Sequence, residues 1–259
     1  TALHAIVFEL LATEKGELPA YCGRAIHAQV LRWIYLGNPQ VAQAVHDGPE
    51  SPISVSDLLT KKRDGRVVRS GDVCFFRLGI LDADILEPLM LGLERWERQI
   101  LHLSNFPFIL SQVCMLPGSN SWVGLSDYDF LAKMAQPVES LQFRLVSPTS
   151  FKMHDGQDIQ PFPLPALVFG NLQRRWNAFA PEHLKIPKVE WQVLVSDFDL
   201  KTRRIYIDKV AEIGTVGRVR YVFPDAEQGR LANQLAHFAF FAGVGRKTAL
   251  GMGQVILES

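Results

Sequence analysis

The chain has 259 residues, of which 47% are hydrophobic, and its 27 lysines and arginines balance its 27 aspartates and glutamates. This length and composition predict a globular protein with one large core or two cores of ordinary size, and exclude a membrane-spanning helix, which needs about 20 consecutive apolar residues. A formal net charge of zero excludes a protein that coats nucleic acid through bulk charge, so any nucleic-acid site has to be local.

Targeting and redox signals indicate the cytoplasm. Residues 1–9 lack the basic start and the cleavage site of a signal peptide. Cys22, Cys74 and Cys114 are odd in number and widely separated, with neither metal-ligand spacing nor a paired framework. We therefore expect reduced cysteines, a cytoplasmic protein and no membrane contact.

The first half of the chain, residues 1–136, reads as one domain. An apolar strand is expected over residues 3–11. A helix then begins near Pro19 and buries a stripe at helical spacing, formed by Ile26, Val30, Trp33 and Ile34. Asn38 suits the N-cap of a second, short helix, with Pro39 at its first position and His46 near its end. A mobile basic loop over 61–71, a strand over 73–80 and a helix over 83–98 follow.

The second half, residues 137–259, begins after a boundary near Gln136 and Pro137. Its pattern predicts the following order: a strand at 141–145, a helix at 163–178, strands at 191–195, 205–211 and 215–223, a helix at 228–241 and a strand at 255–257. Within 215–223, Arg218 and Arg220 share one face of the strand and the apolar residues share the other. Both halves therefore read as βαββαβ units.

Between the last helix and the last strand lies a glycine-rich segment. It contains Gly243, Gly245, Gly251 and Gly253, with Arg246 and Lys247 between them. Glycine permits positive φ, so successive amides can converge on an anion while the two cations add positive charge. A Walker loop needs glycine before Lys247, and a dinucleotide fingerprint needs glycine or alanine at Thr248, so neither familiar phosphate loop fits. The segment is either a loop for a phosphate backbone or a glycine-rich turn.

This segment resembles the carboxy-terminal glycine-rich loop, with its basic residue, of the CRISPR-associated repeat-cleaving endoribonucleases of the RAMP superfamily. Residues 143–152 and 171–177 are similar to the strand, turn and helix that open the second domain of that family. The first half matches more loosely, through its apolar strand, residues 23–27 and His46. The resemblance implies an α+β fold of two tandem ferredoxin-like (RRM-like, βαββαβ) domains.

The resemblance also implies an activity. Such an enzyme binds CRISPR repeat RNA and cleaves the precursor transcript into guide RNAs by attack of the RNA's own 2′-hydroxyl, which leaves a 2′,3′-cyclic phosphate. The chemistry needs a group to remove one proton, a group to donate another, and positive charge near the phosphorane, but no metal. The chain has no metal-ligand motif, so we expect no metal and no cofactor.

Histidine suits both proton-transfer roles because its pKa lies near the working pH. Tyr21, Arg24 and His27 are spaced i, i+3 and i+6 along one helix stripe. His46 lies at a helix end, where the dipole favours the imidazolium. We expect His46 to be the acid or base and Arg24 and His27 to position and stabilise the phosphate, although either histidine fits the family's placement. The alternative for each histidine is an ordinary surface or hydrogen-bonded residue.

The expected RNA contacts are the four glycines of the loop with Arg246 and Lys247, together with Lys152, Arg174, Arg175, Arg218 and Arg220. A basic cluster at Lys61, Lys62 and Arg63 is a further candidate. Trp176 or Phe179 could stack on bases or lie in the core. Each cluster taken alone is also the pattern of a solvated charged surface.

The expected partners are the precursor and the processed guide RNA, with other CRISPR effector subunits and a second copy of the chain as further partners. A competing function is that of a noncatalytic RAMP-type subunit that holds RNA in an effector complex. A pure binder has no need for Tyr21, Arg24, His27 and His46 to converge, so their arrangement distinguishes the two functions. A nucleotide-binding enzyme is a weak third alternative, because both phosphate-loop templates fail.

Overall fold

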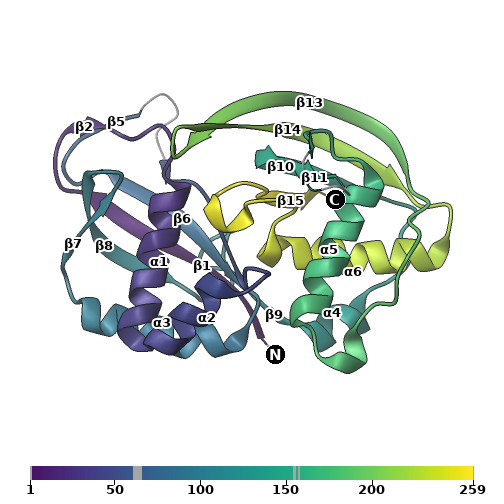
Figure 1. Ribbon diagram of the computed structural model, residues 1–259, viewed down its shortest axis with the longest axis horizontal. Helices are drawn as coiled ribbons and strands as arrows, with labels where there is room; N and C mark the ends of the chain where they lie inside the picture. The colour runs from purple at the N-terminus through teal and green to yellow at the C-terminus, as the bar shows by residue number, and fades with distance from the viewer. Residues whose placement is uncertain (1, 61–65, 154–155, 157, 259) are drawn as a thin grey trace. The chain divides into compact units, whose positions relative to one another are not determined.

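The computed structural model describes residues 2–60, 66–153, 156 and 158–258. Contacts divide the chain into two units (Figure 1). The amino-terminal unit consists of His4–Leu125 together with Ala249–Gly251, and the carboxy-terminal unit consists of Ser126–Thr248 with Met252–Ser259 and Thr1–Leu3. The sequence boundary at 136/137 therefore lies slightly beyond the division by contacts. Lys61, Lys62 and Arg63 lie outside the described residues, as does His154.

The amino-terminal unit is built on an antiparallel sheet with the strand order β3-β6-β1-β8-β7. The strands are β1 (Ala2–Ala12), β3 (Ile53–Val55), β6 (Val73–Ile80), β7 (Ile100–Leu103) and β8 (Phe106–Cys114), with β4 (Leu59–Thr60) and β9 (Gly124–Asp127) added to them. A separate pair is formed by β2 (Gly16–Glu17) and β5 (Val67–Val68). The helices are α1 (Gly23–Gly37), α2 (Pro39–Asp47) and α3 (Leu86–Trp96), the last preceded by the 3-10 turn Ala83–Ile85.

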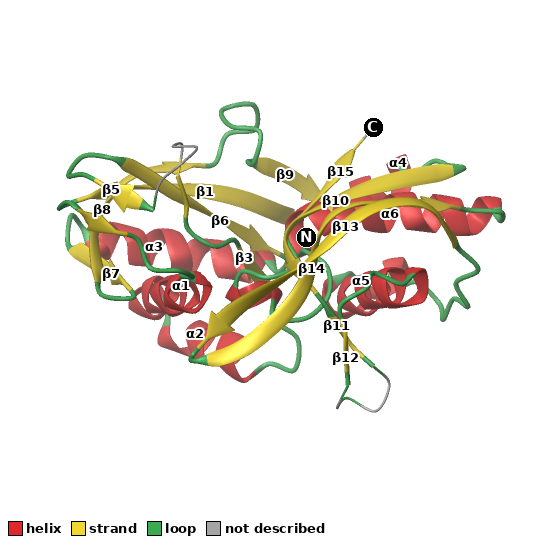
Figure 2. Cartoon of the chain, turned by 90° about the horizontal axis from the view of Figure 1, so that it is seen from above, coloured by secondary structure: helices red, strands yellow, loops and turns green. Residues whose placement is uncertain are grey.

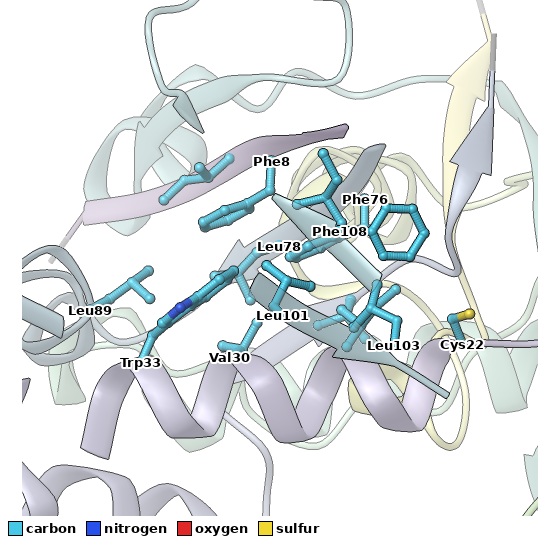
Figure 3. Close-up of a cluster of buried hydrophobic side chains, with 14 of the residues drawn as sticks. Phe8, Cys22, Val30, Trp33, Phe76, Leu78, Leu89, Leu101, Leu103 and Phe108 are labelled. Carbon is cyan, nitrogen blue, oxygen red and sulfur yellow. The ribbon is translucent and has the colours of Figure 1, made fainter. Parts of the chain in front are cut away.

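Helices α1 and α3 pack on one face of this sheet through a continuous apolar core. Ile26, Val30, Trp33 and Ile34 are each 0% exposed, which confirms the predicted stripe. Figure 3 shows Trp33 of α1 aimed at the sheet, where it stacks on Phe8, with ring centroids 5.3 Å apart. Burial of each such side chain stabilises the fold by about 1.5–3 kcal/mol. Closest approach of α1 and α3 requires Gly92, because a Cβ there would lie 1.7 Å from the Trp33 carbonyl oxygen.

Helix α2 begins as predicted. The Asn38 side chain accepts hydrogen bonds from the amides of Gln40 (3.0 Å) and Val41 (3.3 Å), and Pro39 occupies the first turn. A capped start of this kind stabilises a helix by about 1 kcal/mol. Because the helix is nine residues long, its capped start places His46 in its last turn.

The carboxy-terminal unit has a four-stranded sheet of order β13-β14-β10-β15, the order of a ferredoxin-like βαββαβ fold. Its strands are β10 (Ser140–Thr149), β13 (Leu194–Ile207), β14 (Val210–Val222) and β15 (Val255–Glu258), and β11 (Phe151–Lys152) pairs separately with β12 (Ile159–Gln160). The helices are α4 (Tyr128–Met134), α5 (Pro165–Phe179) and α6 (Ala226–Ala242), with 3-10 turns at Glu182–Leu184 and Thr248–Leu250.

Helices α5 and α6 lie beside this sheet (Figure 2). Aromatic side chains join α5 to the sheet and α5 to α6. The ring of Phe169 on α5 lies 5.3 Å from that of Tyr221 on β14, and the ring of Trp176 lies 5.3 Å from that of Phe238 on α6. Trp176 is 0% exposed. It is therefore a core residue, and the alternative of an RNA-stacking ring at Trp176 is wrong.

The strand boundaries expected around the hairpin are also wrong, because the strands expected at 191–195 and 205–211 are parts of one strand, β13, which begins at Leu194 and ends at Ile207. The strand expected over 205–211 crosses a turn at Asp208 and Lys209, whose φ angles are +51° and +68°. The residues on either side pair in register from Ile207 with Val210 to Leu194 with Val222, so β13 and β14 form one long hairpin. An Asp-Lys pair lacks the glycine that usually marks such a turn, which is why the sequence pattern ran through it.

Among the described residues, no helix is long and apolar enough to cross a membrane. Cys22, Cys74 and Cys114 are free cysteines, and the first two are buried. Burial raises the pKa of the Cys22 thiol to about 12. Cys22 is therefore a protonated core residue at neutral pH.

Candidate functional site

Tyr21 lies two residues before α1, and residues 249–251 of the glycine-rich segment pack against it. Helix α1 begins at Gly23, so the expected helix start near Pro19 and the expected place of Tyr21 on one helix stripe with Arg24 and His27 are wrong. The Tyr21 hydroxyl donates a 2.7 Å hydrogen bond to the Leu250 carbonyl oxygen. A Cβ on Gly23 would lie 1.9 Å from that same oxygen, and a Cβ on Gly251, whose φ is +96°, would lie 2.5 Å from the Tyr21 hydroxyl oxygen. Both glycines are thus required for the approach. All of these residues belong to the amino-terminal unit.

His27 is half-buried one turn further along α1, and its environment disfavours the charged form. Burial lowers the pKa of His27 most strongly, the charges of His46 and Arg24 lower it further, and a hydrogen bond with the Ala249 backbone acts in the opposite direction. Its Nδ1 atom is buried and has no hydrogen-bond partner within the described part of the chain. His27 is therefore neutral at pH 7.

The structure brings His27, His46 and Arg24 together. Arg24 and His46 are exposed; they come from α1 and α2 and lie close enough to His27 for their charges to act on it. A neutral imidazole, an exposed imidazole and a guanidinium thus meet beside residues 249–251. Such a set of groups can move protons and can stabilise a developing negative charge.

Asp57 belongs to the same region, although nothing in its sequence neighbourhood singles it out. Its carboxylate accepts a 2.7 Å hydrogen bond from the amide of Cys22, the residue that caps α1. Burial raises the pKa of Asp57 to about 6, against the opposing effects of its bonds from the Cys22 and Leu58 amides and of the Arg66 charge. Aspartate caps are usually recognised from the helix that follows them. Asp57 instead caps a helix 35 residues earlier in the chain, so no local signal could have found it.

The rest of the glycine-rich loop belongs to the carboxy-terminal unit. Gly243, Gly245 and Gly253 have φ angles of +68°, +84° and +72°, as the glycine pattern predicts. The amide of Gly245 donates to the Asn171 side chain (2.8 Å), that of Arg246 to the Ser150 carbonyl (2.9 Å) and that of Gly253 to the Pro148 carbonyl (3.0 Å). These amides hold the loop to β10, to Ser150 between β10 and β11, and to α5. They do not form the open anion nest that the glycine spacing suggested.

The two loop cations are paired with one acid. Arg246 Nη1 and Lys247 Nζ each contact a different carboxylate oxygen of Glu212, on β14. Burial, the largest single influence on Glu212, raises the pKa of its carboxyl, but the bonds from Arg246 and Lys247 outweigh it, so the pKa lies below its usual value. The Glu212 carboxylate therefore acts as the counter-ion of both Arg246 and Lys247.

The other predicted RNA contacts fall into two groups. Lys152, Arg174, Arg218 and Arg220 are exposed, as expected for residues that reach a ligand. Arg218 is paired with Glu258 at 2.8 Å. Arg175 is only 2% exposed and donates to the Ala242 and Gly243 carbonyl oxygens at the end of α6. The expectation for Arg175 is corrected, because a guanidinium buried against these carbonyls is a structural group that RNA phosphates do not reach.

Comparisons with known proteins agree with this architecture. A family model described as CRISPR-associated endoribonuclease Cas6 matches residues 143–255. The product complex of a Thermus thermophilus Cas6 is 24% identical over 99% of both chains, with a TM-score of 0.84. The product complex of a second Cas6 is 29% identical over 100% of both chains (TM-score 0.79), and the substrate-mimic complex of that protein is 28% identical over 99% of both (TM-score 0.70). No curated protein matches the chain.

Proposed function

We propose that the chain is a member of the family of the CRISPR-associated endoribonuclease Cas6, whose family model matches residues 143–255, and that it cleaves CRISPR repeat RNA without a metal ion, through the substrate's own 2′-hydroxyl. The likeness to this family supports RNA cleavage in CRISPR repeat processing, and the metal-independent mechanism is a further step of the proposal. One observation carries it, namely the meeting of neutral His27, exposed His46 and Arg24 beside residues 249–251. The free thiols of Cys22, Cys74 and Cys114 support the cytoplasm as the compartment.

In the proposed reaction the 2′-oxygen bonds to phosphorus while the bond from phosphorus to the 5′-oxygen breaks, which leaves a 2′,3′-cyclic phosphate. His27 accepts the 2′-hydroxyl proton, since a histidine of lowered pKa is already neutral at pH 7. His46, which is exposed in the last turn of α2, donates a proton to the leaving 5′-oxygen. A neutral His27 supplies no positive charge, so stabilisation of the phosphorane falls to Arg24.

Tyr21 has a positioning role in this proposal. Its hydroxyl proton is engaged by the Leu250 carbonyl, so the residue holds the 249–251 turn on α1 beside His27. The hydrogen bond of the Ala249 backbone with His27 links the same turn to the imidazole. The turn thus fixes the direction of the ring that accepts the proton.

RNA binding is proposed for the glycine-rich loop, with Gly243, Gly245, Gly251 and Gly253 setting its shape and Arg246 and Lys247 its charge. The exposed cations Lys152, Arg174, Arg218 and Arg220 are proposed to contact phosphates of the repeat. Paired RNA is read mostly through its phosphates and 2′-hydroxyls, which suits a set of exposed arginines. The cut precursor and the processed guide RNA are the proposed ligands.

The test is cleavage of labelled repeat RNA in EDTA, alongside the same RNA with a 2′-deoxy nucleotide at the cleavage position. The proposal predicts cutting of the all-ribose strand only, with a cyclic phosphate on the product. Cutting of the 2′-deoxy strand would contradict attack by the 2′-hydroxyl. Tight binding without cutting would favour the noncatalytic RAMP-type subunit, and dependence on added metal would contradict the metal-independent step.

A further inference from the structure

The Glu212 carboxylate lies between the two cations of the glycine-rich loop and is almost completely enclosed. Its side chain is 8% exposed, and those of Arg246 and Lys247 are 14% and 29% exposed. Ion pairs at the surface are weakened by water and salt, whereas enclosed pairs are screened much less. The three side chains therefore form a fixed cluster, which we name the Glu212 cluster, and not three mobile surface charges.

One carboxylate between two cations leaves the Glu212 cluster with a net charge of +1. A donor also remains unused, because Arg246 Nε is buried and has no hydrogen-bond partner among the residues that the structure describes. Buried donors are almost always satisfied in folded proteins. A single phosphate would match the remaining charge, and it would contact the Lys247 side chain, the most exposed of the three, because Arg246 Nε itself is buried.

We propose that Glu212 determines RNA specificity by acting as an internal counter-ion. It fixes Arg246 and Lys247 in the position that binds one phosphate of the repeat, and it weakens the non-specific binding of these two cations to RNA of other sequences. The inference rests on the proposed RNA-binding function of the loop. Non-specific affinity arises when free cations neutralise phosphates and release counter-ions. Cations that are already neutralised by a carboxylate release fewer counter-ions and contribute less to non-specific affinity. Only a phosphate that is placed correctly against the fixed cations is bound by both of them.

The experiment compares the protein with Glu212→Gln and with Glu190→Gln. Glu190 is exposed in the same unit, and its printed contact uses only its backbone carbonyl, so both variants make the same chemical change and lose one negative charge at different positions. Affinities for repeat RNA and for an unrelated single strand of equal length are measured over a range of salt concentrations. Glu212→Gln is expected to bind the unrelated strand at least several-fold more tightly than Glu190→Gln does. Its slope of log affinity against log salt should be steeper by about 0.7, the value for one phosphate on a single strand.

The ratio of repeat affinity to unrelated affinity is expected to fall with Glu212→Gln and to stay near its original value with Glu190→Gln. Equal slopes and equal ratios for the two variants would overturn the proposal. Glu212→Gln alone could unfold at too low a temperature to be measured. The double variant Glu212→Gln with Lys247→Gln then restores the net charge of the Glu212 cluster and should return the salt slope to that of the original protein. A salt slope that stays steep in the double variant would overturn the proposal too. A protein that shows no preference for repeat RNA contradicts the proposed function instead, since the salt slope with the unrelated strand tests Glu212 by itself.

Discussion

His27 and His46 occupy different environments, although they lie on neighbouring helices and the charge of His46 acts on His27. His27 is half-buried with a lowered pKa, while His46 is exposed. The folded form of His27 binds its proton less tightly than the unfolded form does. Stability that depends on neutral His27 is therefore lost as pH falls below about 6.5, the usual histidine value, and a base that is neutral at pH 7 is ready to accept a proton.

Alanine in place of either histidine is expected to lower single-turnover cleavage at least about 100-fold, the scale of one lost acid or base, with repeat affinity nearly unchanged. His102→Ala is the matched control, because His102 is an exposed histidine on β7 of the same unit. Unchanged cleavage by His46→Ala would remove His46 from the mechanism and leave His27 and Arg24 as its candidates.

The raised pKa of Asp57 makes the free energy of unfolding depend on pH. Burial raises the pKa of Asp57 to about 6, above the 3.8 that is usual for aspartate, so the folded state holds this proton over a range of pH in which the unfolded state has lost it. The contribution of Asp57 to the free energy of unfolding therefore falls as pH rises from about 4 to about 6, by roughly 2–3 kcal/mol at most.

Asp57→Asn removes this titration and keeps an oxygen that can accept from the Cys22 amide. Urea unfolding at pH 4 and pH 7 should show a smaller loss of stability over that interval for the variant than for the original chain. Parallel stability curves for the two proteins would contradict a raised pKa at Asp57.

At the scale of elements, the important contact is that of the 249–251 turn with the start of α1. Gly23→Ala would bring a Cβ within 1.9 Å of the Leu250 carbonyl oxygen, so the turn has to move. Misplacement by about 1 Å near reacting groups can cost about 100-fold in rate. We expect cleavage to fall at least about tenfold.

The matched control is Gly170→Ala, because a Cβ on Gly170 of α5 would meet nothing within 4 Å. It should leave cleavage unchanged and stabilise α5 by up to about 1 kcal/mol. Circular dichroism checks that both variants keep their fold. Full activity of Gly23→Ala would show that the turn does not position the site.

At the scale of the whole molecule, zero net charge confines RNA affinity to a few local cations. Combining Arg246→Ala and Lys247→Ala with Glu212→Gln removes the Glu212 cluster without leaving a buried carboxylate unpaired. This variant is expected to weaken repeat binding and to flatten its salt dependence by about 0.7 in slope. Unchanged affinity and slope in titrations at several salt concentrations would make the loop a structural element only.

Elements that are specified by neighbouring residues could be predicted from the sequence. The strand at 73–80 and the start of the capped helix after Asn38 agree with the structure, since residue alternation and an N-cap act within a few positions. The turn at Asp208 and Lys209 was missed because its residues carry no turn signal. The sequence did not show that Arg175 and Trp176 are buried. The residue type alone does not distinguish a side chain that faces the core from one that faces a ligand.

The sequence by itself determined the order of two βαββαβ units, the stripe carrying Arg24 and His27, and the resemblance that names the family. Only the tertiary structure decided which distant groups meet. Tyr21 bonds to Leu250 across 229 positions, Arg246 pairs with Glu212 across 34, and Asp57 caps α1 from 35 positions away. Periodicity and capping depend on interactions within one or two turns, whereas the burial of a histidine and the pairing of a loop cation depend on which surfaces the packed core brings together.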